Sequence, residues 1–155
     1  MGFVYCCLYA VCIGILSFLL GRLLPGSAFR KDCFPFRCQP WEKEGAVYNQ
    51  LFHIKKWQAK VPDMSKIFPK LMQAKKVTGN FQQELPGMIR ETRIAEWIHG
   101  LLCILSLPCL LLWKGPGGIL FTAAYILGNI PFILIQRYNR PRLSKLYARM
   151  SSRNS

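Results

Sequence analysis

The chain has 155 residues, enough for one domain, and 52% of them are hydrophobic, which gives a mean hydropathy of +0.19. Its formal net charge is +14 and its sequence pI is about 9.8. A chain both this apolar and this basic is atypical of a soluble globule, but it suits a membrane protein whose charged parts face an anionic leaflet. Because the leaflet explains the charge, we expect no nucleic-acid binding.

The first apolar window is Gly2 to Gly21, which has no charged residue and is long enough to cross a bilayer. It lacks a basic n-region and a small-residue cleavage site, so we interpret it as a retained span of about residues 2–22 and not as a signal peptide. Gly14, Ser17 and Gly21 follow helical spacing, and small residues like these let a neighbouring helix approach closely.

A long polar segment, residues 23–93, follows this span. Ala46 to Val61 is predicted to be a basic amphipathic helix lying along the membrane surface, and Ile67 to Val77 is a weaker segment of the same kind. Pro86 suits the first turn of a long helix that continues into the next span.

Two further windows, about residues 94–113 and 116–136, are apolar enough to span a membrane. The short Gly-rich connection between them predicts antiparallel neighbours. Pro108 interrupts the first of the two, which leaves open whether it crosses fully or is re-entrant. We therefore predict an all-α integral membrane protein, a single membrane domain over residues 1–155, with about three transmembrane helices plus interfacial helices.

The distribution of Lys and Arg predicts the topology. Residues 22–96 hold 14 basic residues and the tail 137–155 holds 6, whereas the connection at 114–118 holds one. The polar segment and the tail are therefore expected in the cytoplasm, with the N-terminus outside. The tail after Pro141 is expected to form a short basic helix, Leu143 to Met150.

The seven cysteines are expected to be structural. Five lie in predicted spans, where cysteine acts as a small apolar residue, and the other two lie in a segment assigned to the reducing cytoplasm. We therefore predict neither disulfides nor a metal site.

A polar face marks the start of the second span. On a helix, Thr92, Glu96 and His99 fall on one face, with Glu91 at its edge. A carboxylate can hold an imidazole in one tautomer and raise its basicity, which a general base requires. The alternative is a helix-end cluster that reaches the headgroups. A di-iron site would need a second Glu-x-x-His copy, which is missing.

The third span carries a second polar face, formed by Tyr125, Asn129 and Gln136 and continued by Asn139 and Arg140. A buried Asn needs a partner, so this face is expected to look into the bundle. The guanidinium fork of arginine binds phosphate bidentately, although positive-inside anchoring alone also explains a basic tail. A serine nucleophile elbow, a P-loop and a His-x4-Asp acyltransferase motif are all missing.

Three segments, LFHIKKWQAKVPD, MIRETRIAEWIHG and IPFILIQRYNRPRL, together resemble the glycosyl-4,4'-diaponeurosporenoate acyltransferase family of the staphyloxanthin-type carotenoid pathway. The resemblance covers residues 46–146. It implies a bacterial cell-membrane enzyme that attaches a fatty acyl chain to a glucose hydroxyl on a carotenoid ester; another glycolipid acceptor stays open. The blocks of the family fall on these residues: Lys55, Lys56, Trp57, Glu91, Thr92, Ala95, Glu96, His99, and Arg137 to Arg142, which include Tyr138 and Asn139.

The resulting mechanistic hypothesis is acyl transfer to a sugar hydroxyl. His99, oriented by Glu96, removes the hydroxyl proton, and no cofactor is expected beyond the donor substrate. The phosphates of acyl-CoA, or of the phosphopantetheine on an acyl carrier protein, are assigned to Arg137, Arg140 and Arg142. The oxyanion donors are assigned to Asn129, Gln136 or Asn139.

Two alternatives come from other classes. The first is a non-enzymatic scaffold or accessory subunit whose tail binds anionic lipid, for which replacing Arg140 and Arg142 with Lys would be harmless. The second is a small transporter, which three spans disfavour unless the chain oligomerises. The sequence leaves the oligomeric state open.

Overall fold

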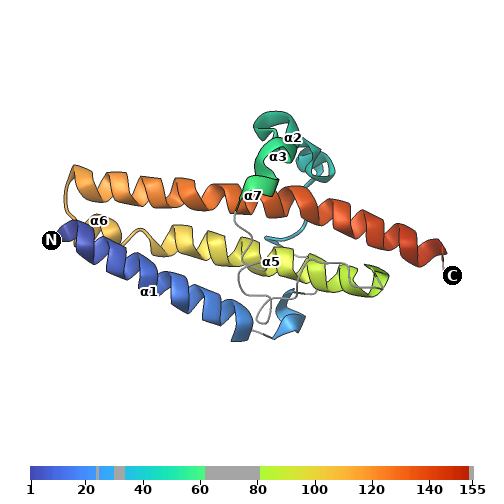
Figure 1. Ribbon diagram of the computed structural model, residues 1–155, viewed down its shortest axis with the longest axis horizontal. Helices are drawn as coiled ribbons and strands as arrows, with labels where there is room; N and C mark the ends of the chain where they lie inside the picture. Colours follow the sequence, from blue (N-terminus) through green and yellow to red (C-terminus); the bar gives the residue numbers. More distant parts are fainter. Residues whose placement is uncertain (24, 30–33, 62–80, 154–155) are drawn as a thin grey trace. The chain divides into compact units, whose positions relative to one another are not determined.

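The computed structural model describes residues 1–23, 25–29, 34–61 and 81–153, and every regular element in these ranges is a helix (Figure 1). Three helical segments are long and apolar enough to cross a membrane: Gly2–Leu23, Phe81–Leu112 and Pro116–Arg153. The predicted all-α membrane fold with three spans is therefore confirmed.

The long helices are α1 (Gly2–Leu23), α5 (Phe81–Leu105) and α7 (Pro116–Arg153), and the four-residue helix α6 (Cys109–Leu112) follows α5. The segment between α1 and α5 contains short elements only. These are η1 (Gly26–Phe29), η2 (Pro40–Gly45), α2 (Ala46–Phe52), α3 (Ile54–Trp57) and η3 (Gln58–Lys60).

The chain forms two compact units. The first consists of Met1–Ala28 and Ile94–Ile133, and the second of the described residues of Phe29–Arg93 and Leu134–Ser155. Helices α5 and α7 each contribute to both units. The prediction of a single membrane domain stays a prediction.

Close helix contact in the first unit depends on Gly21. A Cβ atom on this residue would lie 2.6 Å from Ile98 Cδ1 and 3.2 Å from Ile94 Cγ2, both on α5. A larger residue would force the Ile98 side chain to shift, so glycine favours the close approach of α1 to α5, which is the role that the small-residue spacing predicted for this position. Ser17, one turn earlier, is fully buried.

The second unit has an apolar cluster where α2 and α3 pack on α7. Its buried members are Tyr48, Ile54, Ile135 and Tyr138, and Trp57, Val61 and Leu134 pack against them. Apolar burial of this kind is the main favourable term in holding short helices to a long one. The short helices, which would be marginal alone, are therefore stabilised by α7.

Proline and histidine positions correct several sequence-based boundaries. The predicted helix from Ala46 to Val61 is broken at His53, whose left-handed backbone (φ 51°) ends α2. Pro86 lies inside α5, not in its first turn, because the helix begins at Phe81. As predicted, the second span is interrupted beside Pro108, between α5 and α6.

The C-terminal tail is also different from the expectation. Leu143 to Met150 is not a separate helix, because α7 runs unbroken through Pro131 and Pro141 to Arg153. A proline keeps the helical φ and removes one backbone hydrogen bond, a local cost that the packing of a long helix can offset. The predicted segment from Ile67 to Val77 lies outside the described residues.

Gly45 should be the least replaceable glycine of the second unit. Its φ is +85°, and a Cβ would lie 2.9 Å from the backbone oxygen of Tyr138. We expect Gly45→Ala to lower the free energy of unfolding by about 1–3 kcal/mol, because it adds backbone strain to a clash with α7. Thermal unfolding in detergent measures the effect. Gly14→Ala is the matched control, since a Cβ there has no neighbour within 4 Å, and equal losses in both variants would contradict this account.

Candidate active site

The first unit contains a hydrogen-bonded pair between two helices. His99 on α5 and Asn129 on α7 are joined by a bond of 2.8 Å between the imidazole Nδ1 and the amide Oδ1. Asn129 is buried, and its Nδ2 donates to the backbone oxygen of Tyr125 at 2.8 Å. The expectation that a buried Asn in this span has a partner is confirmed, and the partner is His99.

This pair determines the tautomer of the imidazole. A backbone carbonyl can only accept, so the contact with Tyr125 assigns the amino group of Asn129 to that side and its oxygen to His99. An amide oxygen also only accepts, so His99 Nδ1 must carry the proton. In the neutral ring, Nε2 then keeps a lone pair, which is the state a general base requires.

The plane of the imidazole is fixed as well. The ring of Phe132 stacks on His99 with centroids 4.4 Å apart and an angle of 10° between the planes. A hydrogen bond at one edge and a ring against one face leave the imidazole little freedom to rotate. The ring is therefore preorganised before any substrate binds.

The carboxylates predicted to act with His99 are placed differently. In the described part of the chain, His99 is hydrogen-bonded by Asn129, which was not the partner expected for it. The orienting role predicted for Glu96 stays a prediction. Glu96 is buried one turn before His99 on the same helix, and Glu91 is half-buried. Thr92 is buried and donates its hydroxyl to the Ile89 carbonyl at 2.7 Å.

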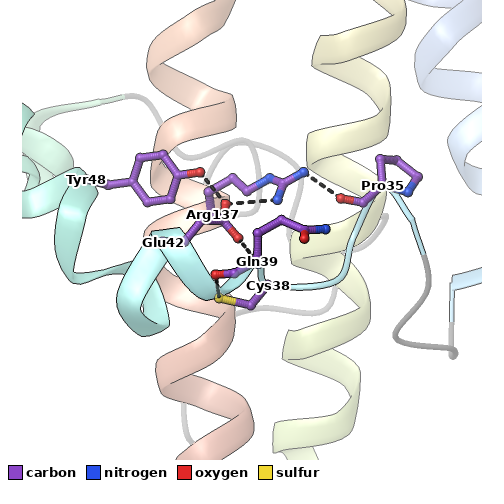
Figure 2. A network of polar contacts seen from close by, with 6 residues as sticks. All are labelled: Pro35, Cys38, Gln39, Glu42, Tyr48 and Arg137. Carbon is purple, nitrogen blue, oxygen red and sulfur yellow. Dashed lines mark hydrogen bonds and ion pairs between the residues drawn. The ribbon is translucent and has the colours of Figure 1, made fainter.

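Arg137 is the centre of a polar network in the second unit (Figure 2). Its guanidinium Nη1 lies 2.9 Å from Glu42 Oε1, and its Nη2 donates to the Pro35 carbonyl. The same carboxylate accepts from the Tyr48 hydroxyl and the Gln39 backbone N–H. Glu42 is only 1% exposed, so an ion pair satisfied on all sides replaces its lost hydration.

The network also sets two ionisation states. Burial alone would raise the pKa of Glu42, but hydrogen bonds from Tyr48 and Gln39 and the charge of Arg137 outweigh it and lower the pKa below its ordinary value. Burial and the neighbouring Glu42 carboxylate raise the pKa of Cys38, which stays a thiol at neutral pH. The six described cysteines are free.

The arginines predicted to hold phosphates separate into two groups. Arg137 is engaged by Glu42, and Arg140 is 3% exposed with its guanidinium carbon 5.8 Å from the ring centroid of Phe36. Their assignment to phosphate stays a prediction. Arg142 is exposed; it lies 4.8 Å from the ring centroid of the buried Tyr138 and donates to its hydroxyl.

Arg142 lines a groove of about 680 Å³ between the first part of α5 and the last part of α7. Its lining residues are Met88, Thr92, Gln136, Asn139, Arg142, Leu143, Lys145, Leu146 and Arg149. Gln136 is buried, and Asn139 donates to Gln58 Oε1 at 3.1 Å. Sequence reasoning missed Lys145 and Arg149, because it ended the helix at Pro141. A continuous helix would have placed them at spacings of three and seven from Arg142.

The basic-aromatic block Lys55, Lys56 and Trp57 is divided by the structure. Both lysine side chains are exposed at α3, whereas Trp57 packs on the apolar cluster and its Nε1 donates to the Phe52 carbonyl at 2.7 Å. Trp57 therefore contributes to the apolar cluster, and both lysines are exposed; the assignment of all three to substrate binding stays a prediction. No group of three or more His, Cys, Asp or Glu side chains among the described residues could hold a metal ion.

Comparison with known sequences identifies the family. The sequence model of the glycosyl-4,4'-diaponeurosporenoate acyltransferases matches residues 29–149. The chain belongs to this family. Glycosyl-4,4'-diaponeurosporenoate acyltransferases of Staphylococcus aureus strains MRSA252, USA300 and Newman are each 31% identical to it over 144 residues, which cover 92% of this chain and 86% of theirs. No solved structure is significantly similar to this acyltransferase.

The Glu42–Arg137 pair should make the second unit of this acyltransferase sensitive to acid. Because the folded pKa of Glu42 lies below its ordinary value of 4.5, the stabilisation is present above pH 4.5 and is lost as the pH falls below it. We expect Glu42→Gln to cost about 3 kcal/mol at neutral pH, since it removes the buried carboxylate that pairs with Arg137. It should also flatten the acid limb of the curve of stability against pH. Unfolding curves at several pH values measure both effects.

Glu44→Gln is the matched control for this variant. Glu44 pairs with Lys145 at 2.6 Å, but both side chains are at least half exposed, so the loss should be close to zero. Equal destabilisation by the two substitutions, or an unchanged acid limb in Glu42→Gln, would refute the role given to the buried pair.

Proposed function

We propose that this acyltransferase moves a fatty acyl chain from an activated thioester, acyl-CoA or acyl carrier protein, to a sugar hydroxyl of a glycosylated lipid. The name of the relatives points to a glycosyl carotenoid as the acceptor. The observation that carries the proposal is the His99–Asn129 pair, because it leaves the imidazole Nε2 as a proton acceptor on an apolar helix.

The proposed reaction has one general base and no metal. His99 Nε2 takes the proton of the sugar hydroxyl while the oxygen attacks the thioester carbonyl. As the carbonyl re-forms, the new C–O bond remains and the C–S bond breaks. The leaving thiolate takes the proton from the imidazolium, which restores the neutral ring. Products are the acylated sugar and a free thiol.

Other polar residues have supporting roles in the proposal. Asn129, engaged by both His99 and Tyr125, is better suited to positioning the base than to binding an oxyanion. Glu96, buried one turn before His99, would stabilise the imidazolium as it forms. Glu91 remains assigned to the edge of the polar face that carries His99. Gln136 and Asn139 remain assigned to binding of the acyl donor.

The proposed orientation follows the basic residues. The positive-inside rule assigns the second unit, where most Lys and Arg lie, to the cytoplasm and the N-terminus to the outside of a bacterial cell membrane. A lipid-soluble acceptor and a cytosolic thioester would then meet at the inner membrane surface. Binding of membrane lipids by a scaffold explains the basic residues, but it gives no reason for an oriented imidazole.

Replacement of the base tests the proposal. We expect His99→Asn to lower turnover by about 10²–10⁴-fold, because asparagine cannot accept the hydroxyl proton at neutral pH. The assay uses purified protein in nanodiscs, labelled palmitoyl thioesters and a glycolipid extract from the host, with mass spectrometry of the acylated product. The chain has two histidines, so His53→Asn is the matched control.

His53 is exposed and has a left-handed backbone conformation that asparagine also tolerates, so this control should keep full activity. Full activity in folded His99→Asn would remove His99 from the chemistry. Absence of product with wild type, using both kinds of thioester, would favour the scaffold.

A further inference from the structure

The groove of the second unit has the composition of a phosphate-binding site. Its rim carries Arg142, Lys145 and Arg149, one cation on each of three successive turns of α7. Met88 and Leu146 are among its apolar lining residues, and no acidic side chain lines it among the described residues. Its volume of about 680 Å³ lies within the usual range for sites that hold small molecules.

Two side chains that line the groove are placed to bind a ligand. Arg142 is held over the ring of Tyr138 and donates to its hydroxyl, which limits the freedom of the guanidinium before binding. Gln136 is 8% exposed, lines the groove, and has no hydrogen-bond partner in the described part of the chain. Its amide offers donors and an acceptor to the groove, where a polar group of a ligand can bind.

The middle cation of the row, Lys145, can leave its ion pair for a ligand at small cost. Lys145 Nζ lies 2.6 Å from Glu44 Oε2, with 50% of the lysine and 66% of the glutamate side chain exposed. A pair exposed to this extent contributes little, so a phosphate can replace the carboxylate at small cost. The binding of one divalent or several monovalent phosphates would then offset the positive charge of the rim.

We propose that this groove binds the nucleotide end of a coenzyme A thioester, an inference that rests on the proposed acyl transfer and chooses its donor. Arg142 and Arg149 are about 10 Å apart along the helix axis, with Lys145 between them. Coenzyme A carries a diphosphate and a separate 3'-phosphate, which suits cations spread over this length. The prosthetic group of a carrier protein offers one phosphodiester, whose single negative charge would leave most of the row of cations unneutralised.

Binding of the free coenzyme tests this site without chemistry. Wild-type protein in phosphatidylcholine nanodiscs is titrated calorimetrically with coenzyme A, 3'-dephospho-coenzyme A and pantetheine. We expect affinity to fall in that order, with no measurable binding of pantetheine. Each of Arg142→Gln, Lys145→Gln and Arg149→Gln should weaken coenzyme A binding about tenfold, and the triple variant should abolish it.

Arg153→Gln is the matched control, because Arg153 is an exposed cation on the same helix outside the groove. It should bind coenzyme A like wild type, and thermal unfolding verifies that all variants are folded. Equal affinity for pantetheine and coenzyme A, or wild-type affinity in the triple variant, would overturn the assignment. The assignment would also be overturned if the groove did not bind coenzyme A but bound phosphatidylglycerol nanodiscs through the same three cations. The bound phosphate would then be that of a lipid headgroup.

The turnover assay separates this inference from the proposed function. Product from palmitoyl-coenzyme A, lost in the triple variant, is the expected result. Product from palmitoyl carrier protein alone would overturn the donor assignment and leave acyl transfer standing. No product from either donor, together with tight coenzyme A binding in the groove, would remove the proposed function and keep the nucleotide site.

Discussion

Polar side chains on apolar helices must find partners inside the protein, and this constraint organises both units of the acyltransferase. Hydrocarbon offers no hydrogen bonds, so a polar group on α7 gains stability when another element supplies its partner. Asn129 is matched by His99, Arg137 by Glu42 and Asn139 by Gln58. The pairs hold α5 and the short helices against α7. They also engage some polar groups and leave others able to bind a substrate.

The candidate functional residues differ from the structural ones in whether their polar atoms are open to a ligand. Arg137 is half-buried and paired with Glu42, and Arg140 is buried, whereas Arg142 is exposed beside a groove that also carries Lys145 and Arg149. His99 combines both conditions: Asn129 binds its Nδ1, and its Nε2 has no hydrogen-bond partner among the described residues. An oriented base and a row of cations are the two elements on which the proposed acyl transfer from coenzyme A rests.

The sequence predicted what is local and missed what depends on distant partners. Continuous apolar runs identified the three spans, and helical spacing identified Gly21 and the polar face with His99. Local patterns could not show that Glu42 pairs with Arg137, 95 residues away, or that Asn129 binds the imidazole. The break at His53 and the passage of α7 through Pro141 depend on packing that overrides local propensity.

The tautomer of His99 is the most direct test of the central claim. Protein labelled with ¹⁵N-histidine has only two imidazoles, and His53→Asn assigns the remaining signals to His99. At a pH where the ring is neutral, the account predicts a protonated Nδ1 and an unprotonated Nε2, with this state lost in Asn129→Leu. A proton on Nε2, or a tautomer that Asn129→Leu leaves unchanged, would contradict the account.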